Sequence, residues 1–221
     1  MRKVHIIYIF ALMASLFTMA SCSESEGTEE EFANWKTKNE TQFDQIYSEA
    51  KAKADAGDNT WKVIRGFQFE STAPAHNYNN IVVHVLTEGK GSGCPLYTDS
   101  VRVNLRGQLM PSLSYSGGYT FLTTYPGDFD PATAATGKYP VLTSTYITDG
   151  LSTALQNMHI GDRWMVYVPY QLGYGTTDQS TNVVVPAYSM LIYDVRLVGY
   201  YRAGTNVPDA HAQAAGEWVE E

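Results

Sequence analysis

The sequence predicts an α+β domain in which a curved antiparallel sheet wraps around one short helix. Two observations support this prediction. Several short segments alternate apolar and polar side chains, as half-buried strands do, and one short helical pattern lies between them. The chain has 221 residues, which is room for one such domain with a small N-terminal extension.

The first 22 residues have the pattern of a targeting segment. Arg2 and Lys3 are positive, and the apolar run over 6–19 is short for a membrane-spanning helix. Small residues then lead to Cys22, an arrangement that resembles the lipobox of bacterial lipoproteins, in which the cysteine is lipidated. An ordinary secretory signal cleaved nearby is the alternative. The acidic run after Cys22 resembles the tethers and surface-export signals of Bacteroidetes lipoproteins, and we expect 23–31 to be a charged tether.

Composition excludes several classes of function. The net charge of −8 and the pI near 5.1 argue against nucleic acid, which requires a basic patch. Two cysteines are too few for a cysteine-rich zinc site, and Cys94 has no partner for an internal disulfide if Cys22 carries lipid. The five histidines are scattered without metal-ligand spacing. We therefore expect neither a metal nor a cofactor.

A helix is predicted after the tether. Apolar residues recur at three- and four-residue steps from Phe32 and Trp35 through Phe43 and Ile46, and Gly57 is placed as a C-terminal stop. This stripe is interpreted as core or as a docking face, with a dimer contact as the alternative.

Strand patterns follow from Trp61. The clearest are "NNIVVHVLTEG", "DSVRVNLRGQL", "RWMVYVPY" and "SMLIYDVRLVGYY". The segment over 110–140, rich in Gly, Pro, Thr and Tyr, is expected to be irregular. The short helix is predicted around Leu151, Leu155 and Met158, with Gly161 as its stop.

These patterns divide the chain into five parts. The predicted boundaries are a lipoprotein signal peptide over 1–22, an acidic tether over 23–31, a helical extension over 32–60, the main domain over 61–201 and a flexible tail over 202–221.

Four stretches of the main domain resemble one known family. They are "VRVNLRGQL", "GYTF", "YITDGLSTALQNMHIGDRWMVYVPYQLGYG" and "VVVPAYSMLIYDVRLVGYY". Their order and spacing are similar to those of FKBP-type peptidyl-prolyl cis-trans isomerases, the macrolide-binding immunophilins. The resemblance covers roughly residues 81–201 and implies the FKBP-like fold, with the preceding helix similar to the N-terminal extension of bacterial lipoprotein members.

The resemblance also implies site residues. Phe121 stands at the family's pocket phenylalanine, and Tyr174 at the tyrosine whose hydroxyl bonds the substrate carbonyl. Ile147 and Thr148 occupy the Val-Ile pair, where a backbone N–H receives a substrate carbonyl. The catalytic candidates are therefore Tyr174, Phe121 and Thr148. The remaining candidates for substrate binding are Ile147, Leu151, Val185, Tyr193, Leu105 and Leu122.

Three of these positions depart from the family pattern. Leu105 replaces a tyrosine, Leu122 replaces the aspartate that follows the pocket phenylalanine, and Leu151 replaces the tryptophan of the pocket floor. We expect these changes to weaken or re-tune turnover rather than to alter the fold.

The resemblance implies an isomerase that assists the folding of extracytoplasmic proteins. Its expected partners are proline-containing polypeptide segments and macrolide ligands, with the membrane reached through lipid on Cys22 in the cell envelope. One alternative is a peptide-binding or chaperone lipoprotein on the same fold with weak or no turnover. Another is a structural lipoprotein that holds a partner in an outer-membrane complex.

Overall fold

The structure is a computed structural model that describes residues 30–70, 72–182, 184–203 and 216–219. Cys22, the predicted signal peptide and most of the predicted tether lie outside the described residues. Within the described residues, no helix is both long enough and apolar enough to cross a membrane.

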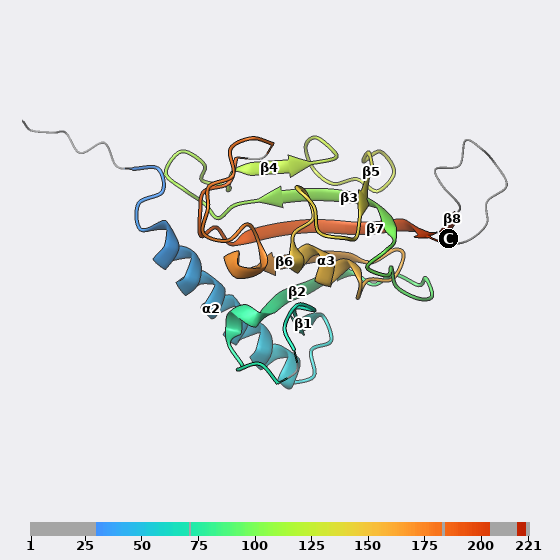
Figure 1. The fold of residues 1–221 in the computed structure, drawn as a ribbon, viewed down its shortest axis with the longest axis horizontal. Helices are drawn as coiled ribbons and strands as arrows, with labels where there is room; N and C mark the ends of the chain where they lie inside the picture. The colour runs from blue at the N-terminus through green and yellow to red at the C-terminus, as the bar shows by residue number, and fades with distance from the viewer. Residues whose placement is uncertain (1–29, 71, 183, 204–215, 220–221) are drawn as a thin grey trace, which may run out of the picture. The chain divides into compact units, whose positions relative to one another are not determined.

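Two α-helices, two short 3-10 helices and eight strands make up the described chain (Figure 1). In chain order they are α2 (Trp35–Asp55), β1 (Trp61–Arg65), η1 (Asn77–Asn79), β2 (Asn80–Thr87), β3 (Ser100–Gln108), β4 (Thr120–Thr123), β5 (Gly137–Pro140), α3 (Asp149–Leu155), β6 (Arg163–Val168), η2 (Tyr170–Leu172), β7 (Leu191–Ala203) and β8 (Gly216–Val219).

The strands form one antiparallel sheet. Their order is β1-β2-β6-β7-β3-β4, with β5 paired to the other end of β3 and β8 to the far end of β7. The register places Tyr193 of β7 between Val166 of β6 and Gly107 of β3. The long central strands β3 and β7 therefore carry the side chains at the middle of the sheet.

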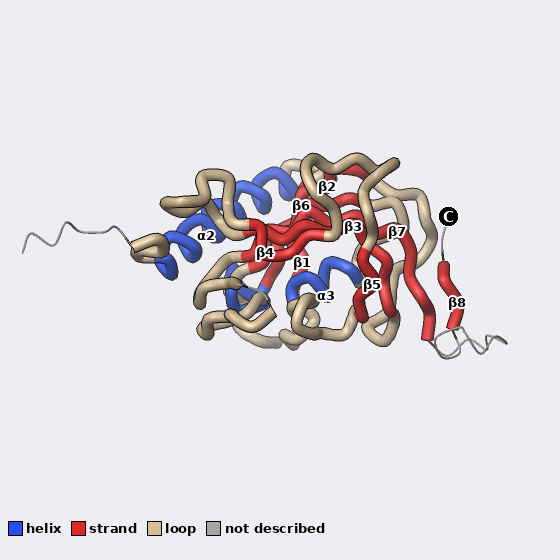
Figure 2. Tube along the Cα trace, turned by 90° about the horizontal axis from the view of Figure 1, so that it is seen from above, coloured by secondary structure: helices blue, strands red, loops and turns tan. Residues whose placement is uncertain are grey.

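The two helices lie on opposite faces of this sheet (Figure 2). Alternation along β2 shows why: Val83 belongs to the main core together with Leu151 of α3, whereas Val82 packs with Phe43 of α2. Burying apolar side chains on both faces is the main driving force for this arrangement. The predicted α+β fold, a curved sheet on one short helix with a helical extension, is confirmed.

The predicted N-terminal helix is also confirmed. Gly57 adopts a φ of 90° just after the helix, the left-handed conformation that glycine tolerates best. Trp35 and Phe43 are buried. The apolar stripe is therefore part of the core of this chain.

Three details differ from the prediction. Helix α3 ends at Leu155, and Gly161, with a φ of 92°, instead makes the turn into β6. Strands β4 and β5 lie within the segment expected to be irregular, because the open edge of β3 supplies their hydrogen-bonding partners. Four residues of the expected flexible tail, Gly216–Val219, form β8 for the same reason, along the free edge of β7.

Candidate functional site

Three aromatic rings from three separate segments meet at the inner face of the sheet. The ring centroids of Phe121 and Tyr193 are 5.8 Å apart, and those of Phe121 and Tyr174 are 6.3 Å apart. Both pairs are edge-to-face, at interplanar angles of 79° and 81°, the geometry that aromatic quadrupoles favour. Strand β4, the loop after η2 and strand β7 thus build one aromatic cluster.

Gly107 makes room for this cluster. A Cβ atom at this position would lie 2.6 Å from Cζ of Phe121 and 3.1 Å from Cε1 of Tyr193. The contact with Phe121 is too short for a real Cβ atom, so the Phe121 ring can occupy its present place only because residue 107 has no side chain.

The N-terminus of α3 forms the next wall. The side chain of Thr148 caps the helix by accepting a hydrogen bond from the backbone N–H of Leu151 at 3.4 Å. Ile147 and Leu151 are fully buried beside it. Among the described residues, no hydrogen-bond acceptor is found for the backbone N–H of Thr148. This N–H is the donor that the sequence predicted for a substrate carbonyl.

The Tyr174 hydroxyl is a second donor at the site. It donates to the backbone carbonyl of Thr145 at 2.9 Å. Burial raises the pKa of Tyr174 to about 12, and the nearby Tyr146 adds to this effect. The hydroxyl is therefore protonated throughout the neutral range, and a ligand carbonyl would have to replace the carbonyl of Thr145 to accept from it.

The Tyr193 hydroxyl is buried, and the hydroxyls of Thr148 and Tyr174 lie close enough to act on its pKa without making a hydrogen bond of good geometry. No group among the described residues meets hydrogen-bond geometry with it. Burial raises the pKa of Tyr193 well above its ordinary value, and the neighbouring Tyr174 raises it further, whereas the Thr148 hydroxyl acts in the opposite direction. An unpaired buried donor is costly, so this tyrosine places an unused polar group within an otherwise apolar site.

The structure brings together all nine site residues that the sequence predicted. They join or pack against one hydrophobic core: Leu105, Ile147, Leu151, Val185 and Tyr193 are buried in it, Phe121, Leu122 and Tyr174 pack against it, and Thr148 caps the helix beside it. Among the described residues, no group of three or more metal-ligating side chains is found.

Sequence reasoning missed two tyrosines beside the site. The rings of Tyr139 on β5 and Tyr146 in the following loop are edge-to-face, with centroids 6.1 Å apart. Tyr146 directly precedes Ile147 and influences the pKa of Tyr174. The sequence signal was the position of Tyr146 next to the predicted pair Ile147–Thr148. Tyr139 could be placed only once β5 was known.

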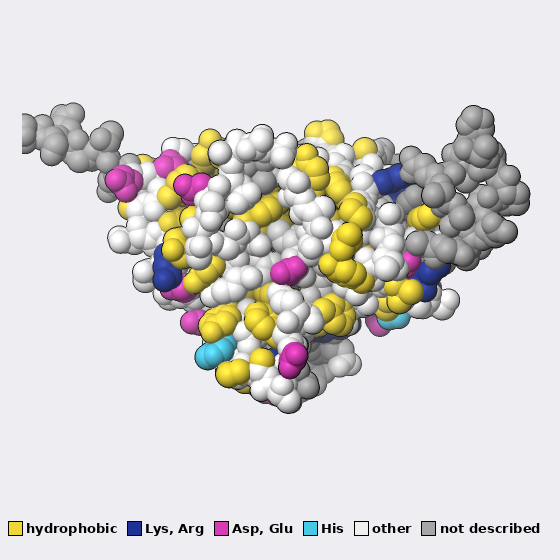
Figure 3. All heavy atoms as spheres, in the orientation of Figure 1, with side chains coloured by type: hydrophobic (Ala, Val, Ile, Leu, Met, Phe, Trp, Pro, Cys, Tyr) yellow, Lys and Arg dark blue, Asp and Glu magenta, His cyan; other side chains and the backbone are white. Residues whose placement is uncertain are grey.

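The face that carries α3 has apolar side chains in several patches, with few charged groups among them (Figure 3). Exposed apolar residues on the described chain include Leu113, Leu142, Tyr146 and Val184. The aromatic cluster, the two donors and the apolar walls together form the candidate site of this α+β domain, beside the N-terminus of α3.

Comparison with known proteins finds a family match over part of the chain. Residues 97–198 match the family model described as FKBP-type peptidyl-prolyl cis-trans isomerase. This match spans a little under half of the chain, and over these residues the resemblance expected from the motifs is confirmed.

Two curated relatives are similar to part of this chain. The macrophage infectivity potentiator of Trypanosoma cruzi is 26% identical over 126 residues, which are 57% of this chain and 56% of the relative. The FKBP-type 22 kDa peptidyl-prolyl cis-trans isomerase of Escherichia coli is 26% identical over 114 residues, 52% of this chain and 47% of the relative. The chain thus spans about half the length of each relative.

Solved structures of similar proteins include two bacterial ones. FkpA from Escherichia coli has a TM-score of 0.49 at 21% identity, covering 76% of this chain and 62% of that one. A peptidyl-prolyl cis-trans isomerase from Pseudomonas syringae pv. tomato has a TM-score of 0.49 at 19% identity, covering 79% and 98%.

Proposed function

We propose that this protein is a peptidyl-prolyl cis-trans isomerase that acts on proline-containing segments of extracytoplasmic polypeptides. The observation that carries the proposal is the aromatic cluster of Phe121, Tyr174 and Tyr193 beside the N–H of Thr148, which has no acceptor in the described part of the chain. It combines an apolar wall for a prolyl ring with two hydrogen-bond donors for carbonyl groups.

The chemistry requires no acid, base or nucleophile. Rotation about an Xaa–Pro bond is slow because amide resonance must be broken, at a barrier of about 18–20 kcal/mol. In the twisted state the charge separation of the planar imide falls, so a dry apolar environment favours that state over the planar one. Phe121 and the buried walls would supply this environment.

The two donors have separate tasks in this mechanism. The N–H of Thr148 would hold a substrate carbonyl at the helix N-terminus, where the backbone dipole also favours partial negative charge. The Tyr174 hydroxyl, which stays protonated at neutral pH, would bind a second carbonyl in place of Thr145. Fixing both sides of the proline converts binding energy into restraint on the rotating bond.

The test is an isomerisation assay on an Xaa-Pro peptide, with the wild-type chain, Phe121→Ala and Tyr174→Phe. We expect kcat/KM to fall at least tenfold in Phe121→Ala, which corresponds to about 1.4 kcal/mol, and to fall less in Tyr174→Phe. Tyr125→Phe, outside the cluster, serves as the control. A wild-type rate equal to the uncatalysed rate would refute the proposal. Inhibition by a macrolide ligand would test the same site independently.

A second function is favoured by a specific observation. Leu105, Leu122 and Leu151 stand where the resemblance places a tyrosine, an aspartate and a tryptophan, so the site lacks groups that the family's pocket carries. A peptide-binding or chaperone module with weak turnover would tolerate these changes. Saturable binding of a proline-containing peptide, and suppressed aggregation of a refolding client without faster proline-limited refolding, would identify this second function.

The location proposed for the chain is the cell envelope, with a lipid anchor on Cys22 at the outer membrane. It rests on the positive, apolar and small-residue pattern that ends at Cys22. Metabolic labelling with a fatty-acid analogue tests it: label should enter the wild-type chain and be absent from Cys22→Ala. Recovery of unlabelled wild-type chain in the soluble fraction would contradict the anchor.

A further inference from the structure

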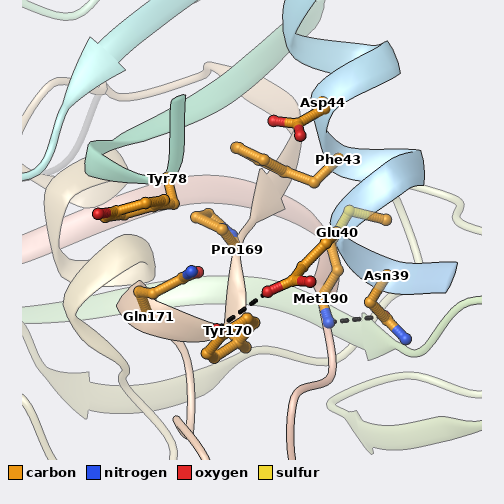
Figure 4. Close-up of a pocket in the computed structure, with 9 residues that line it drawn as sticks. All are labelled: Asn39, Glu40, Phe43, Asp44, Tyr78, Pro169, Tyr170, Gln171 and Met190. Atoms are coloured by element: carbon orange, nitrogen blue, oxygen red, sulfur yellow. Dashed lines mark hydrogen bonds between the residues drawn. The ribbon is translucent and has the colours of Figure 1, made fainter. Parts of the chain in front are cut away.

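A second cavity lies where α2 meets η1, η2 and the start of β7, and it shares no residue with the candidate isomerase site. Its volume is about 430 Å³, within the range of ordinary ligand pockets. Figure 4 shows its walls, which include Phe43, Tyr78 and Tyr170. We call this space the α2 cavity.

The charge of the α2 cavity is negative. Glu40 and Asp44 are one turn apart on α2, so both carboxylates lie on the same side of the helix. The nine described residues that line the cavity include these two acids and no lysine, arginine or histidine. A cation entering the cavity would therefore meet both carboxylates.

The present partners of the two carboxylates are few and replaceable. The Tyr170 hydroxyl donates to Glu40 at 3.2 Å, and the Asn77 amide donates to Asp44 at 2.8 Å. Lys36 lies 3.9 Å from Glu40, with both side chains substantially exposed. Exposed pairs of this kind contribute little to stability, so a better-placed cation could compete with Lys36.

The wall opposite the helix supplies an unused acceptor. The side-chain Oε1 of Gln171 is buried and has no hydrogen-bond partner among the described residues. In Figure 4 the Gln171 amide extends toward the space between Tyr78 and Pro169. Because a buried carbonyl oxygen without a donor is unfavourable, this position favours a ligand rich in N–H donors.

Aromatic rings form further walls of the α2 cavity. Tyr78 is 38% exposed at the cavity, and Phe43 and Tyr170 approach from the other walls (Figure 4). Cations bind over such rings. Guanidinium suits the combination best, because it is planar, stacks on aromatic faces and offers five N–H donors to several acceptors at once.

We propose that the α2 cavity binds an arginine side chain of a partner polypeptide. The guanidinium lies between the aromatic walls, pairs with Glu40 and Asp44, and donates to Oε1 of Gln171. This site recognises charge, whereas the isomerase site recognises an apolar ring, and its existence does not depend on isomerase activity.

The experiment is an NMR titration of the full chain with the peptide acetyl-Gly-Arg-Gly-amide. The control peptide replaces arginine with citrulline, which has nearly the same shape and no charge. We expect the arginine peptide to give saturable shifts at the Gln171 side-chain amide, binding at least tenfold more tightly than the citrulline peptide. Added salt should weaken the arginine complex.

Three variants locate the site. Glu40→Gln with Asp44→Asn should weaken arginine binding at least tenfold, and Gln171→Met should weaken it without changing net charge. The matched control, Glu49→Gln with Asp55→Asn, removes two charges from the same helix outside the cavity and should bind as the wild type does. If the first variant does not fold, Gln171→Met decides. Equal binding of both peptides, unchanged binding by the Gln171 variant, or no saturable shift at millimolar peptide would overturn the proposal.

Discussion

The indole N–H of Trp35 donates to the hydroxyl of Ser189 at 2.8 Å, a buried contact between residues 154 positions apart. The Ser189 hydroxyl in turn donates to the carbonyl of Pro186 at 2.7 Å. One turn further along α2, Oδ1 of Asn39 accepts from the backbone N–H of Met190 at 2.8 Å. Helix α2 therefore holds in place the segment that follows Val185 and leads into β7, and so supports one wall of the candidate site.

Trp35→Phe tests this support, because it keeps the apolar ring and removes the donor. We expect the free energy of unfolding to fall by about 1–2 kcal/mol, which is the cost of one buried hydrogen bond and some lost packing. Amide exchange over 184–190 should become faster. Urea unfolding and hydrogen exchange measure the two effects.

A double-mutant cycle with Ser189→Ala isolates the contact. The coupling free energy should be about 0.5–1 kcal/mol, because the two side chains touch directly. The exposed Ser48 on the same helix, changed to Ala in combination with Trp35→Phe, is the control and should give additive losses. Additivity for Trp35 and Ser189 as well would show that their hydrogen bond contributes nothing.

Gly107→Ala should disable the aromatic cluster. The new methyl would lie 2.6 Å from the Phe121 ring, so the ring must move away from Tyr174 and Tyr193. We expect stability to fall by about 1–3 kcal/mol from overpacking and kcat/KM to fall with it. Gly117→Ala is the control, because a Cβ there meets no atom within 4 Å. Wild-type turnover by Gly107→Ala would show that the position of Phe121 is unimportant.

Tyr193→Phe should stabilise the protein. It removes a buried hydroxyl that lacks a partner among the described residues and leaves the ring in place. We expect a gain of about 1 kcal/mol in the free energy of unfolding, measured by urea denaturation. By contrast, Tyr125→Phe removes a hydroxyl that donates to Asp194 at 3.3 Å and should not stabilise. A loss of stability in Tyr193→Phe would indicate that its hydroxyl has a partner after all.

Tyr174 should lower stability at alkaline pH. Its pKa is about 12 in the folded chain and about 10 when unfolded, so the folded state favours the neutral form. The stability that the folded state gains from this pKa difference is fully present below about pH 10 and is lost as the pH rises through about 12. Wild-type stability should therefore fall more steeply than that of Tyr174→Phe between about pH 10 and about pH 12. Parallel urea-unfolding profiles for the two proteins would contradict the raised pKa.

Glu31 should titrate below its usual range. Its carboxylate accepts from the hydroxyls of Ser112 and Ser114, each at 2.5 Å, and from the Ser114 N–H at 2.9 Å. These hydrogen bonds, that of Ser112 first, lower the pKa of Glu31 below 4.5. The contribution of Glu31 to the free energy of unfolding is thus present above its ordinary pKa of 4.5. It is lost as the pH falls through the lowered pKa.

The Ser114 amide resonance reports this titration by NMR. Its chemical shift should change with a midpoint below 4.5, the ordinary value. In Glu31→Gln the resonance should not titrate, which makes that variant the control. A midpoint at or above the ordinary value would mean that the two serines do not hold the carboxylate.

Strong local patterns made much of the fold predictable. The alternation in β3, β6 and β7 and the apolar spacing of α2 are long enough to identify an element without any neighbour. Strands β4, β5 and β8 have four residues each and no comparable pattern. They are strands because β3 and β7 offer unpaired edges, and an edge is a property of the assembled sheet.

The candidate site likewise has features that could be predicted from the sequence and features that could not. The order of the motifs around Phe121, Ile147 and Tyr174 was sufficient to place each residue at a family position. That order could not reveal the hydrogen bond from Tyr174 to Thr145, or that the Tyr193 hydroxyl has no partner of good geometry among the described residues. Both depend on interatomic distances that must be right to within about a few tenths of an ångström.

By itself, the amino-acid sequence determined the types of the long elements and the resemblance from which the site residues were predicted, since periodicity and motif order are local properties of the chain. Only the tertiary structure decided that α2 supports the segment before β7, that Gly107 admits Phe121 and that acids and aromatic rings enclose the α2 cavity. Each of these follows from packing between distant segments, where excluded volume and desolvation, rather than local pattern, set the outcome.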